Sequence, residues 1–172
     1  SLLEDVLHID TINTIEIIKT IQQYNGVEGC NRYIISQCNS ALNAMEVYGL
    51  FLLSGWRKQE MTIDIVPLFE TIDDLQQAAD VMKTLYTNAV YNEHLHRRGN
   101  RQTIMLGFSD GTKDGGYLMA NWSIYKAKEA LTAISRKHHI DVVFFDGRGG
   151  PPSRGRGKTH TFYASMGHNI SN

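Results

Sequence analysis

The sequence predicts an α/β fold built from parallel β/α repeats. Strand-like and helix-like segments alternate along the chain, and the strand-like runs are apolar on consecutive residues, as in "DIVPLF", "TIMLGF" and "DVVFF". Such runs are typical of parallel strands that are buried on both faces. No linker or low-complexity tract interrupts the 172 residues. We therefore expect a single segment, 1–172, without an internal domain boundary.

The first repeat follows an N-terminal helix. Isoleucines recur every three residues at positions 12, 15, 18 and 21, which predicts a helix over residues 11–24 that stops at "NGVEG". The β-branched and aromatic run "RYIIS", residues 32–36, predicts the first strand. Asn39 or Ser40 can cap the long apolar helix that comes next.

Three further repeats complete the pattern. Strands are predicted over residues 61–70, 101–107 and 140–147. Helices are predicted over residues 71–88, 89–98 and 117–139. Thr71 can cap the first of these helices, and acidic residues in its first turn suit the helix dipole.

Composition excludes several function classes. The chain is 42% hydrophobic and 20% charged, with a formal net charge of −1, so no global field attracts nucleic acid or an anionic membrane. The longest apolar run, residues 48–56, is too short to cross a bilayer. The two cysteines, Cys30 and Cys38, match neither a disulfide framework nor a zinc pair. We therefore expect both cysteines to be reduced and the protein to be cytoplasmic.

Acidic residues stand at the ends of three predicted strands: Glu70, Asp110 and Asp146. In a parallel sheet the carboxyl ends of the strands share one edge, where sites form. Glu70 and Asp110 are the oxygen donors that Mg²⁺ prefers, so they are candidate metal ligands. In the alternative reading, Glu70 caps or salt-bridges at a helix start and Asp110 caps a turn.

A basic loop follows the last predicted strand. Arg148, Arg154, Arg156 and Lys158 lie among glycines with no acidic residue between Gly147 and His160. Glycines let the backbone approach an anion and arginine can grip phosphate with two donors, although a solvated basic loop has the same composition. Lys113 can face a ligand phosphate or pair with a neighbouring aspartate.

Two other motifs occur in the same loops. Residues 107–111 match G-x-S-x-G, the nucleophile elbow of serine hydrolases, but "DGTKDGG" prolongs the loop where the elbow needs a helix directly after Ser109. Residues 157–159 match the end of a P-loop, but Pro152 stands where its first glycine belongs. The histidine pairs at 94 and 96 and at 138 and 139 lie near polar helix ends, so we expect them to be solvated and not metal ligands.

Three long blocks resemble successive blocks of phosphoenolpyruvate carboxylase. They are "VPLFETIDDL" (66–75), "GFSDGTKDGG" (107–116) and "FDGRGGPPSRGRGKTH" (145–160), in the family's order and approximate spacing. The resemblance implies about half of a TIM-type barrel, with long helices. It also implies a parent enzyme that forms oxaloacetate and phosphate from phosphoenolpyruvate and bicarbonate.

The resemblance also implies roles for individual residues. Glu70 and Asp110 would hold Mg²⁺ (or Mn²⁺), and Lys113 would support the phosphate or the enolate. The glycine-rich loop would hold the phosphorylated intermediate through Arg148, Gly149, Gly150 and Arg154. We further expect a homo-oligomer, because half of a barrel leaves strand edges unpaired.

The chain departs from the family pattern in three ways. Asp146 replaces the usual histidine at the start of the glycine-rich loop, and Arg156 replaces a glycine. The family's upstream histidine block and downstream arginine block do not occur in these residues. The opening "SLLEDVLHID" has neither a start methionine nor the pattern of a leader peptide, so we expect a longer parent protein. We therefore predict that the isolated segment is inactive, with a noncatalytic phosphometabolite-binding domain as the alternative.

Overall fold

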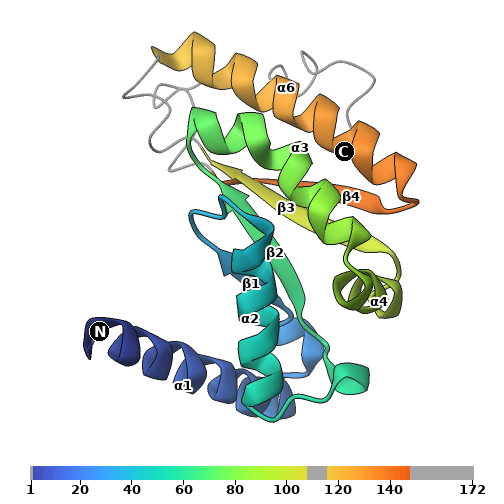
Figure 1. The fold of residues 1–172 in the computed structure, drawn as a ribbon. Helices are drawn as coiled ribbons and strands as arrows, with labels where there is room; N and C mark the ends of the chain where they lie inside the picture. Colours follow the sequence, from blue (N-terminus) through green and yellow to red (C-terminus); the bar gives the residue numbers. More distant parts are fainter. Residues whose placement is uncertain (1, 108–115, 148–172) are drawn as a thin grey trace.

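The sheet has four parallel strands that lie side by side in chain order (Figure 1). The structure is a computed structural model that describes residues 2–107 and 116–147. The strands are β1 (Arg32–Ile35), β2 (Asp64–Phe69), β3 (Arg101–Gly107) and β4 (Asp141–Gly147). Each strand pairs in parallel with the one before it. The prediction of parallel β/α repeats is therefore confirmed.

The helices occupy the predicted intervals. They are α1 (Leu2–Asn25), α2 (Ala41–Leu53), α3 (Ile72–Thr87), α4 (Ala89–Arg97) and α6 (Gly116–Lys137), with short 3₁₀ helices η1 (Val27–Gly29) and η2 (Lys58–Glu60). Helix α1 begins earlier than the predicted residue 11 because no glycine or proline interrupts the preceding residues. Strand β2 begins later than predicted because Asp64 is the residue opposite the first residue of β1.

Side-chain caps fix where two helices start. The Thr71 hydroxyl accepts a hydrogen bond from the Asp74 amide, and the Asp74 carboxylate accepts one from the Thr71 amide, both at 3.1 Å. The predicted cap at Thr71 is therefore confirmed. The Asn88 side chain caps α4 by accepting from the amides of Val90 and Tyr91. The Thr71 cap sets the point at which the chain leaves β2 and enters the helical layer, and the Asn88 cap separates α4 from α3.

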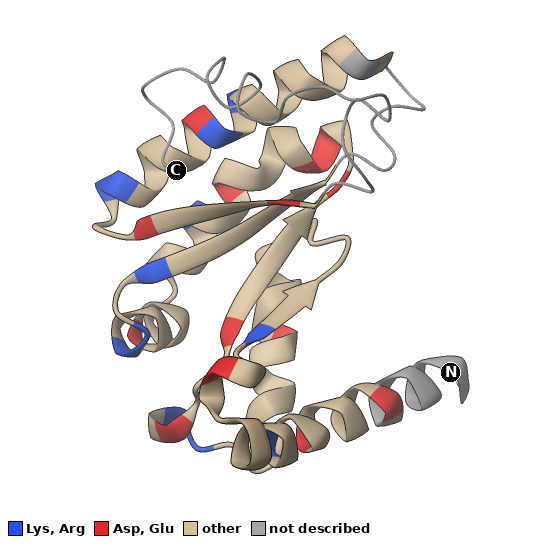
Figure 2. Cartoon of the chain, turned by 180° about the vertical axis from the view of Figure 1, so that it is seen from behind, with Lys and Arg blue, Asp and Glu red and all other residues tan. Residues whose placement is uncertain are grey.

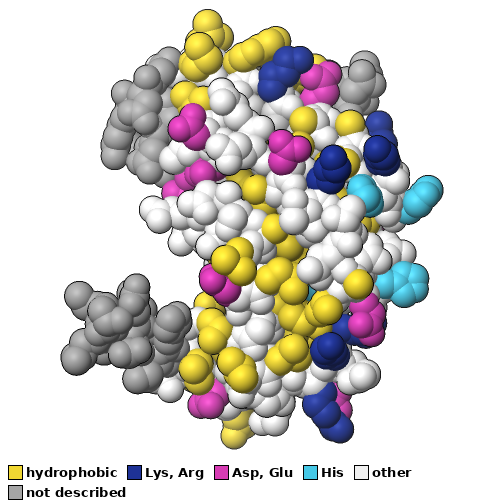
Figure 3. Space-filling model, in the orientation of Figure 1, with side chains coloured by type: hydrophobic (Ala, Val, Ile, Leu, Met, Phe, Trp, Pro, Cys, Tyr) yellow, Lys and Arg dark blue, Asp and Glu magenta, His cyan; other side chains and the backbone are white. Residues whose placement is uncertain are grey.

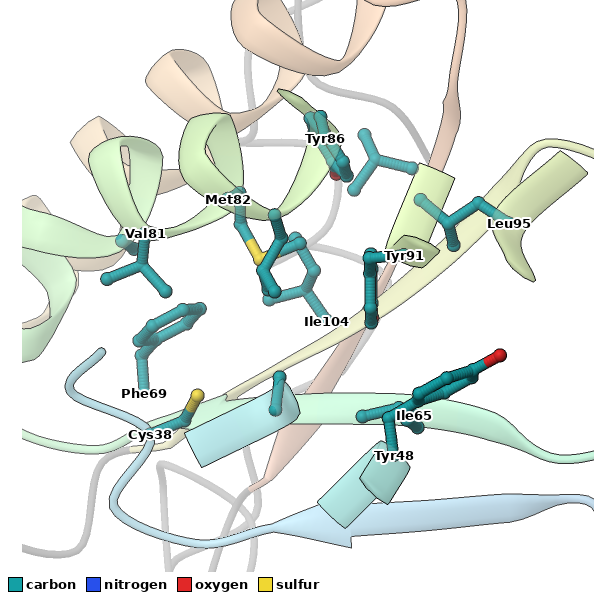
Figure 4. Packing of buried hydrophobic residues seen from close by; sticks show 14 of the residues in the cluster. Cys38, Tyr48, Ile65, Phe69, Val81, Met82, Tyr86, Tyr91, Leu95 and Ile104 are labelled. Carbon is teal, nitrogen blue, oxygen red and sulfur yellow. The ribbon is translucent and has the colours of Figure 1, made fainter. Parts of the chain in front are cut away.

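One hydrophobic core lies between the helices and one face of the sheet. Strand residues of the core include Ile65, Phe69, Ile104, Leu106 and Val142, which occupy alternate positions along their strands. In Figure 4, Phe69 points from β2 toward α3. Burial of this face against α3 and α6 holds the strands in register.

The opposite face of the sheet is not covered by any of the helices described here. Figure 2 shows the strands in front of α3 and α6 when the molecule is seen from behind. Ile34 of β1 and Phe145 of β4 lie on this face and remain 47% and 56% exposed. Apolar side chains that are exposed on a parallel sheet indicate a surface made to be covered.

Hydrophobic side chains also reach the surface of α2. Leu42 and Leu53 are exposed, and Figure 3 shows hydrophobic side chains gathered over this part of the molecule. Among the described helices, none is both long enough and apolar enough to cross a bilayer. Cys30 and Cys38 are free thiols, and burial raises the pKa of Cys38 to about 11.

His94 contradicts the prediction that the histidines are solvated. Its side chain is only 1% exposed. The His94 ring, on α4, contacts the rings of Tyr48 and Tyr91 at centroid distances of 5.3 and 6.1 Å. Burial, with a smaller contribution from nearby arginines, lowers its pKa to about 4. His96 is exposed, as predicted.

Candidate metal and anion site

The carboxyl ends of β2, β3 and β4 lie next to one another. Phe69 of β2 pairs with Leu106 of β3, which pairs with Asp146 of β4. Gly107 and Gly147 form the next pair. The sheet therefore brings together the starts of the three segments that carry the predicted site residues.

Glu70 is the one predicted ligand that the structure describes. It directly follows β2 and is half-buried. A Cβ built on Gly107 would lie 3.3 Å from the Glu70 Cγ, so the glutamate packs over the end of β3. Leu106 faces the helices, and Gly107, the next residue, therefore faces the uncovered side of the sheet. The Glu70 side chain lies on that side.

The Glu70 carboxylate is not used by the helix that follows. Thr71, not Glu70, caps α3. Within residues 2–107 and 116–147, no hydrogen bond or ion pair holds this carboxylate. The alternative in which Glu70 serves as a cap or a structural ion-pair partner is therefore not found in this part of the chain.

Two glycines allow the strand ends to pack tightly. A Cβ on Gly147 would lie 2.5 Å from the Met105 Cε and 3.3 Å from its Cγ. A Cβ at Gly107 would press on the Glu70 side chain, and a Cβ at Gly147 would require the end of the Met105 side chain to move. Glycine at both positions lets Glu70 and Met105 lie flat against the ends of β3 and β4.

The other predicted site residues lie outside the described residues. Ser109, Asp110 and Lys113 fall in the segment after β3, and the four residues of the glycine-rich loop fall after β4: Arg148, Gly149, Gly150 and Arg154. The structure places the strand ends that lead into both segments at one edge of the sheet. Across the described ranges, no three His, Cys, Asp or Glu side chains form a group that could hold a metal.

Sequence reasoning missed Lys128. Its ammonium lies 2.9 Å from the Asp146 carboxylate, and the side chains are only 5% and 12% exposed. The signal was present, because Lys128 lies four residues after Ile124 and three before Leu131, on the face of α6 that packs on the core. A lysine at a core position predicts a buried counter-charge.

Comparison with known proteins identifies the family. The family model for phosphoenolpyruvate carboxylase matches residues 5–166. The chain belongs to the phosphoenolpyruvate carboxylase family. The match includes all three blocks on which the resemblance rests.

Curated phosphoenolpyruvate carboxylases align with most of the chain. The protein from Corynebacterium diphtheriae is 39% identical over 160 residues, which cover 91% of this chain and 17% of that protein. The protein from Nitrosomonas eutropha is 39% identical over 81% of this chain and 15% of its own length. The protein from Rhodothermus marinus is 47% identical over 60% of this chain. The chain spans less than a fifth of the length of these carboxylases.

Proposed function

We propose that the chain is the metal-binding and anion-binding part of a phosphoenolpyruvate carboxylase. The observation that carries the proposal is the Glu70 carboxylate, which lies at the carboxyl edge of the sheet, beside the ends of β3 and β4, with no structural partner in the described ranges. Family membership over residues 5–166 supports the same assignment. The four strands in chain order, with helices on one face, suit about half of a TIM-type barrel.

The donor set suits a hard divalent cation. Glu70 and Asp110 would hold Mg²⁺ or Mn²⁺, which bind carboxylate oxygen and complete their shells with water and substrate. A half-buried carboxylate with no ion-pair partner among the described groups fits this role. The bound metal supplies positive charge that stabilises the enolate and the transferring phosphoryl group.

The glycine-rich loop would hold the anionic substrate. Arg148 and Arg154 offer paired donors to phosphate oxygens, while Gly149 and Gly150 let the backbone approach them. Lys113, in the segment after β3, would support the phosphate or the enolate. Fixed cations hold phosphoenolpyruvate and bicarbonate together against their mutual repulsion.

The chemistry follows from that arrangement. A bicarbonate oxygen attacks the phosphorus of phosphoenolpyruvate and the bond from phosphorus to the enol oxygen breaks, giving carboxyphosphate and pyruvate enolate. Carboxyphosphate releases CO₂ and phosphate, and the enolate carbon attacks the CO₂ to form oxaloacetate. The arginines of the loop bind the phosphoryl oxygens through the first step and stabilise charge that develops on them.

Substitution of Glu70 in the full-length protein tests the proposal. We expect Glu70→Gln to reduce oxaloacetate formation and to weaken Mn²⁺ activation by about 100-fold or more, since even outer-shell changes cost about 10- to 100-fold. Glu16→Gln, on an exposed position of α1, is the control. An unchanged Mn²⁺ dependence in a folded Glu70→Gln protein would refute the metal assignment.

The alternatives have their own tests. A noncatalytic phosphometabolite-binding domain would bind phosphoenolpyruvate in the full-length protein without forming oxaloacetate. A serine hydrolase would react with a fluorophosphonate probe at Ser109. We expect Asp110→Asn to abolish metal-dependent turnover and Ser109→Ala to affect it little. The isolated 172-residue segment should form no oxaloacetate, and detectable product would contradict that expectation.

A further inference from the structure

Asn25 and Gly26 form the only Asn-Gly dipeptide in the sequence. Asn25 is the last residue of α1, and Gly26 comes directly before the short helix η1. Both residues are exposed. Asparagine followed by glycine is chemically reactive as well as typical of a turn, because no Cβ shields the glycine nitrogen from the side-chain amide. The end of α1 is therefore a place where the main chain can react with a side chain.

The Gly26 amide is not held by the helix that it follows. After α2, α3 and α4, the amide of the next residue donates to the carbonyl four residues earlier, as Ser54 does to Leu50 at 2.9 Å. Within residues 2–107 and 116–147, no such hydrogen bond is found for the Gly26 amide. The nitrogen that would react thus lacks the bond that holds the corresponding amide at the other helix ends.

The backbone at Gly26 also has room to change its conformation. Gly26 has a φ of +78°, and a Cβ built on it would meet no atom within 4 Å. Ring closure requires Asn25 to leave its helical backbone angles, which fraying of the last helical turn permits. The Gln22 side chain, one turn earlier, stays bonded to the Cys30 carbonyl at 2.6 Å and to the Thr62 hydroxyl at 2.8 Å. We therefore expect the reaction to proceed while α1 remains packed on the core.

We propose that Asn25 is a site of spontaneous deamidation through a succinimide. The Gly26 nitrogen attacks the Asn25 Cγ, the bond from Cγ to Nδ2 breaks, and ammonia leaves with the proton that the Gly26 amide gives up. Water then opens the ring. Hydrolysis between the nitrogen and Cγ gives aspartate, and hydrolysis between the nitrogen and the main-chain carbonyl carbon gives isoaspartate. The inference is independent of the proposed function.

Both products alter the end of α1. Each places a carboxylate at the negative end of the helix dipole, close in sequence to the acidic Glu28. Isoaspartate also carries the main chain through Cγ, so the Asn25 Cβ becomes a main-chain atom. That atom lies where a Cβ built on Gly29 would be only 2.9 Å away. We therefore expect isoaspartate to open the tight turn between α1 and η1.

Incubation of the folded full-length protein in mildly alkaline water labelled with heavy oxygen tests the proposal. Peptide mapping by mass spectrometry should show aspartate and isoaspartate at position 25, both carrying the label, which excludes conversion during the later digestion. Asn100 is the matched control, because it is exposed and has a φ of +55° but precedes an arginine, and it should keep its amide.

Two variants isolate the ring closure. Gly26→Ala places a Cβ beside the attacking nitrogen and should lose the labelled products at position 25. Because alanine at this φ is strained, Asn25→Gln provides a second test. Glutamine would have to close a larger ring, so this variant should also lose the labelled products. An isoaspartyl methyltransferase should transfer methyl groups to the incubated wild type and not to Asn25→Gln.

Three results would overturn the proposal. The first is an Asn25 that keeps its amide in the folded protein over a period in which the urea-unfolded protein converts, because the native turn would then protect it. The second is equal conversion of Asn25 and Asn100. The third is equal methyl transfer to the incubated wild type and to Asn25→Gln.

Discussion

Glu70 packs against Gly107, the last residue of β3. A Cβ on Gly107 would lie 3.3 Å from the Glu70 Cγ and 3.7 Å from its Cα. The absence of a side chain at Gly107 thus helps to define where the Glu70 side chain, directly after β2, can lie. A Cβ added at position 107 would press on the proposed metal ligand, which would have to shift by a few tenths of an ångström.

Gly107→Val in the full-length protein should displace Glu70. Valine suits a strand, so the fold should persist while Mn²⁺ activation weakens by about 10-fold or more, as for other changes that disturb ligand orientation. Mn²⁺ titration of activity measures the effect. Gly49→Ala is the control, because a Cβ there meets no atom within 4 Å, and it should stabilise α2 by about 0.5–1 kcal/mol. Wild-type Mn²⁺ activation in folded Gly107→Val would contradict the prediction.

The cap at the start of α3 should contribute measurable stability. Thr71→Ala removes the acceptor for the Asp74 amide and should lower the free energy of unfolding by about 1 kcal/mol. Urea unfolding of the 172-residue chain, followed by circular dichroism, tests it. Thr84→Ala is a matched control, since that hydroxyl only bonds back to the Asp80 carbonyl within the helix. Equal unfolding midpoints for Thr71→Ala and the wild type would be evidence against this cap.

His94 should make stability depend on pH. Burial lowers its pKa from the ordinary 6.5 to about 4, helped by Arg97 and Arg98 and opposed by Asp64. Between these values the unfolded chain binds more protons, so stability falls as pH drops from 6.5 to 4, by up to about 3 kcal/mol.

Replacement of the histidine isolates this effect. His94→Phe should flatten the pH dependence of urea unfolding between pH 6.5 and 4, because phenylalanine retains the packing without a titratable group. His96→Gln, on the exposed side of α4, should leave that dependence unchanged. A His94→Phe chain with the wild-type pH profile would show that other groups cause the acid sensitivity.

The isolated segment should self-associate. Strands β1 and β4 are the edges of the sheet within the described residues, and Ile34 and Phe145 expose apolar surface on the face opposite the helices. Sedimentation velocity should show species larger than a monomer. Lysine at both positions should shift the sample toward monomer, whereas Tyr24→Lys on α1 should not. A dilute wild-type sample that sediments as a stable monomer would count against this prediction.

Local patterns were sufficient for the type and order of the helices and strands, although α1 begins before the predicted residue 11 and β2 after the predicted residue 61. Strand β3 has the predicted limits because its apolar run stops at Gly107, and α3 begins after Thr71 because a cap and an acidic first turn coincide there. The error at His94 arose from reading the polar end of α4 as solvated. Tyr91 and Leu95, one helical turn away on the same face, indicated burial.

Contacts between distant residues were not readable from the sequence. The approach of Glu70 to Gly107 depends on the register of β2 against β3, which the chain sets through packing and not through a local motif. The pairing of Lys128 with Asp146 likewise depends on how α6 lies on β4. The identity of the candidate ligands came from residue type and strand-end position, and their assignment to Mg²⁺ stays a prediction.

The order of the strands bears on how the protein is made. Each strand pairs with the one that precedes it in the chain, so each new pairing joins segments that are close together in the sequence. Such local closure favours fast assembly, and a growing chain can add one strand and its helix at a time as it leaves the ribosome. We therefore expect β1 to be already paired with β2 before the residues of the glycine-rich loop have been translated.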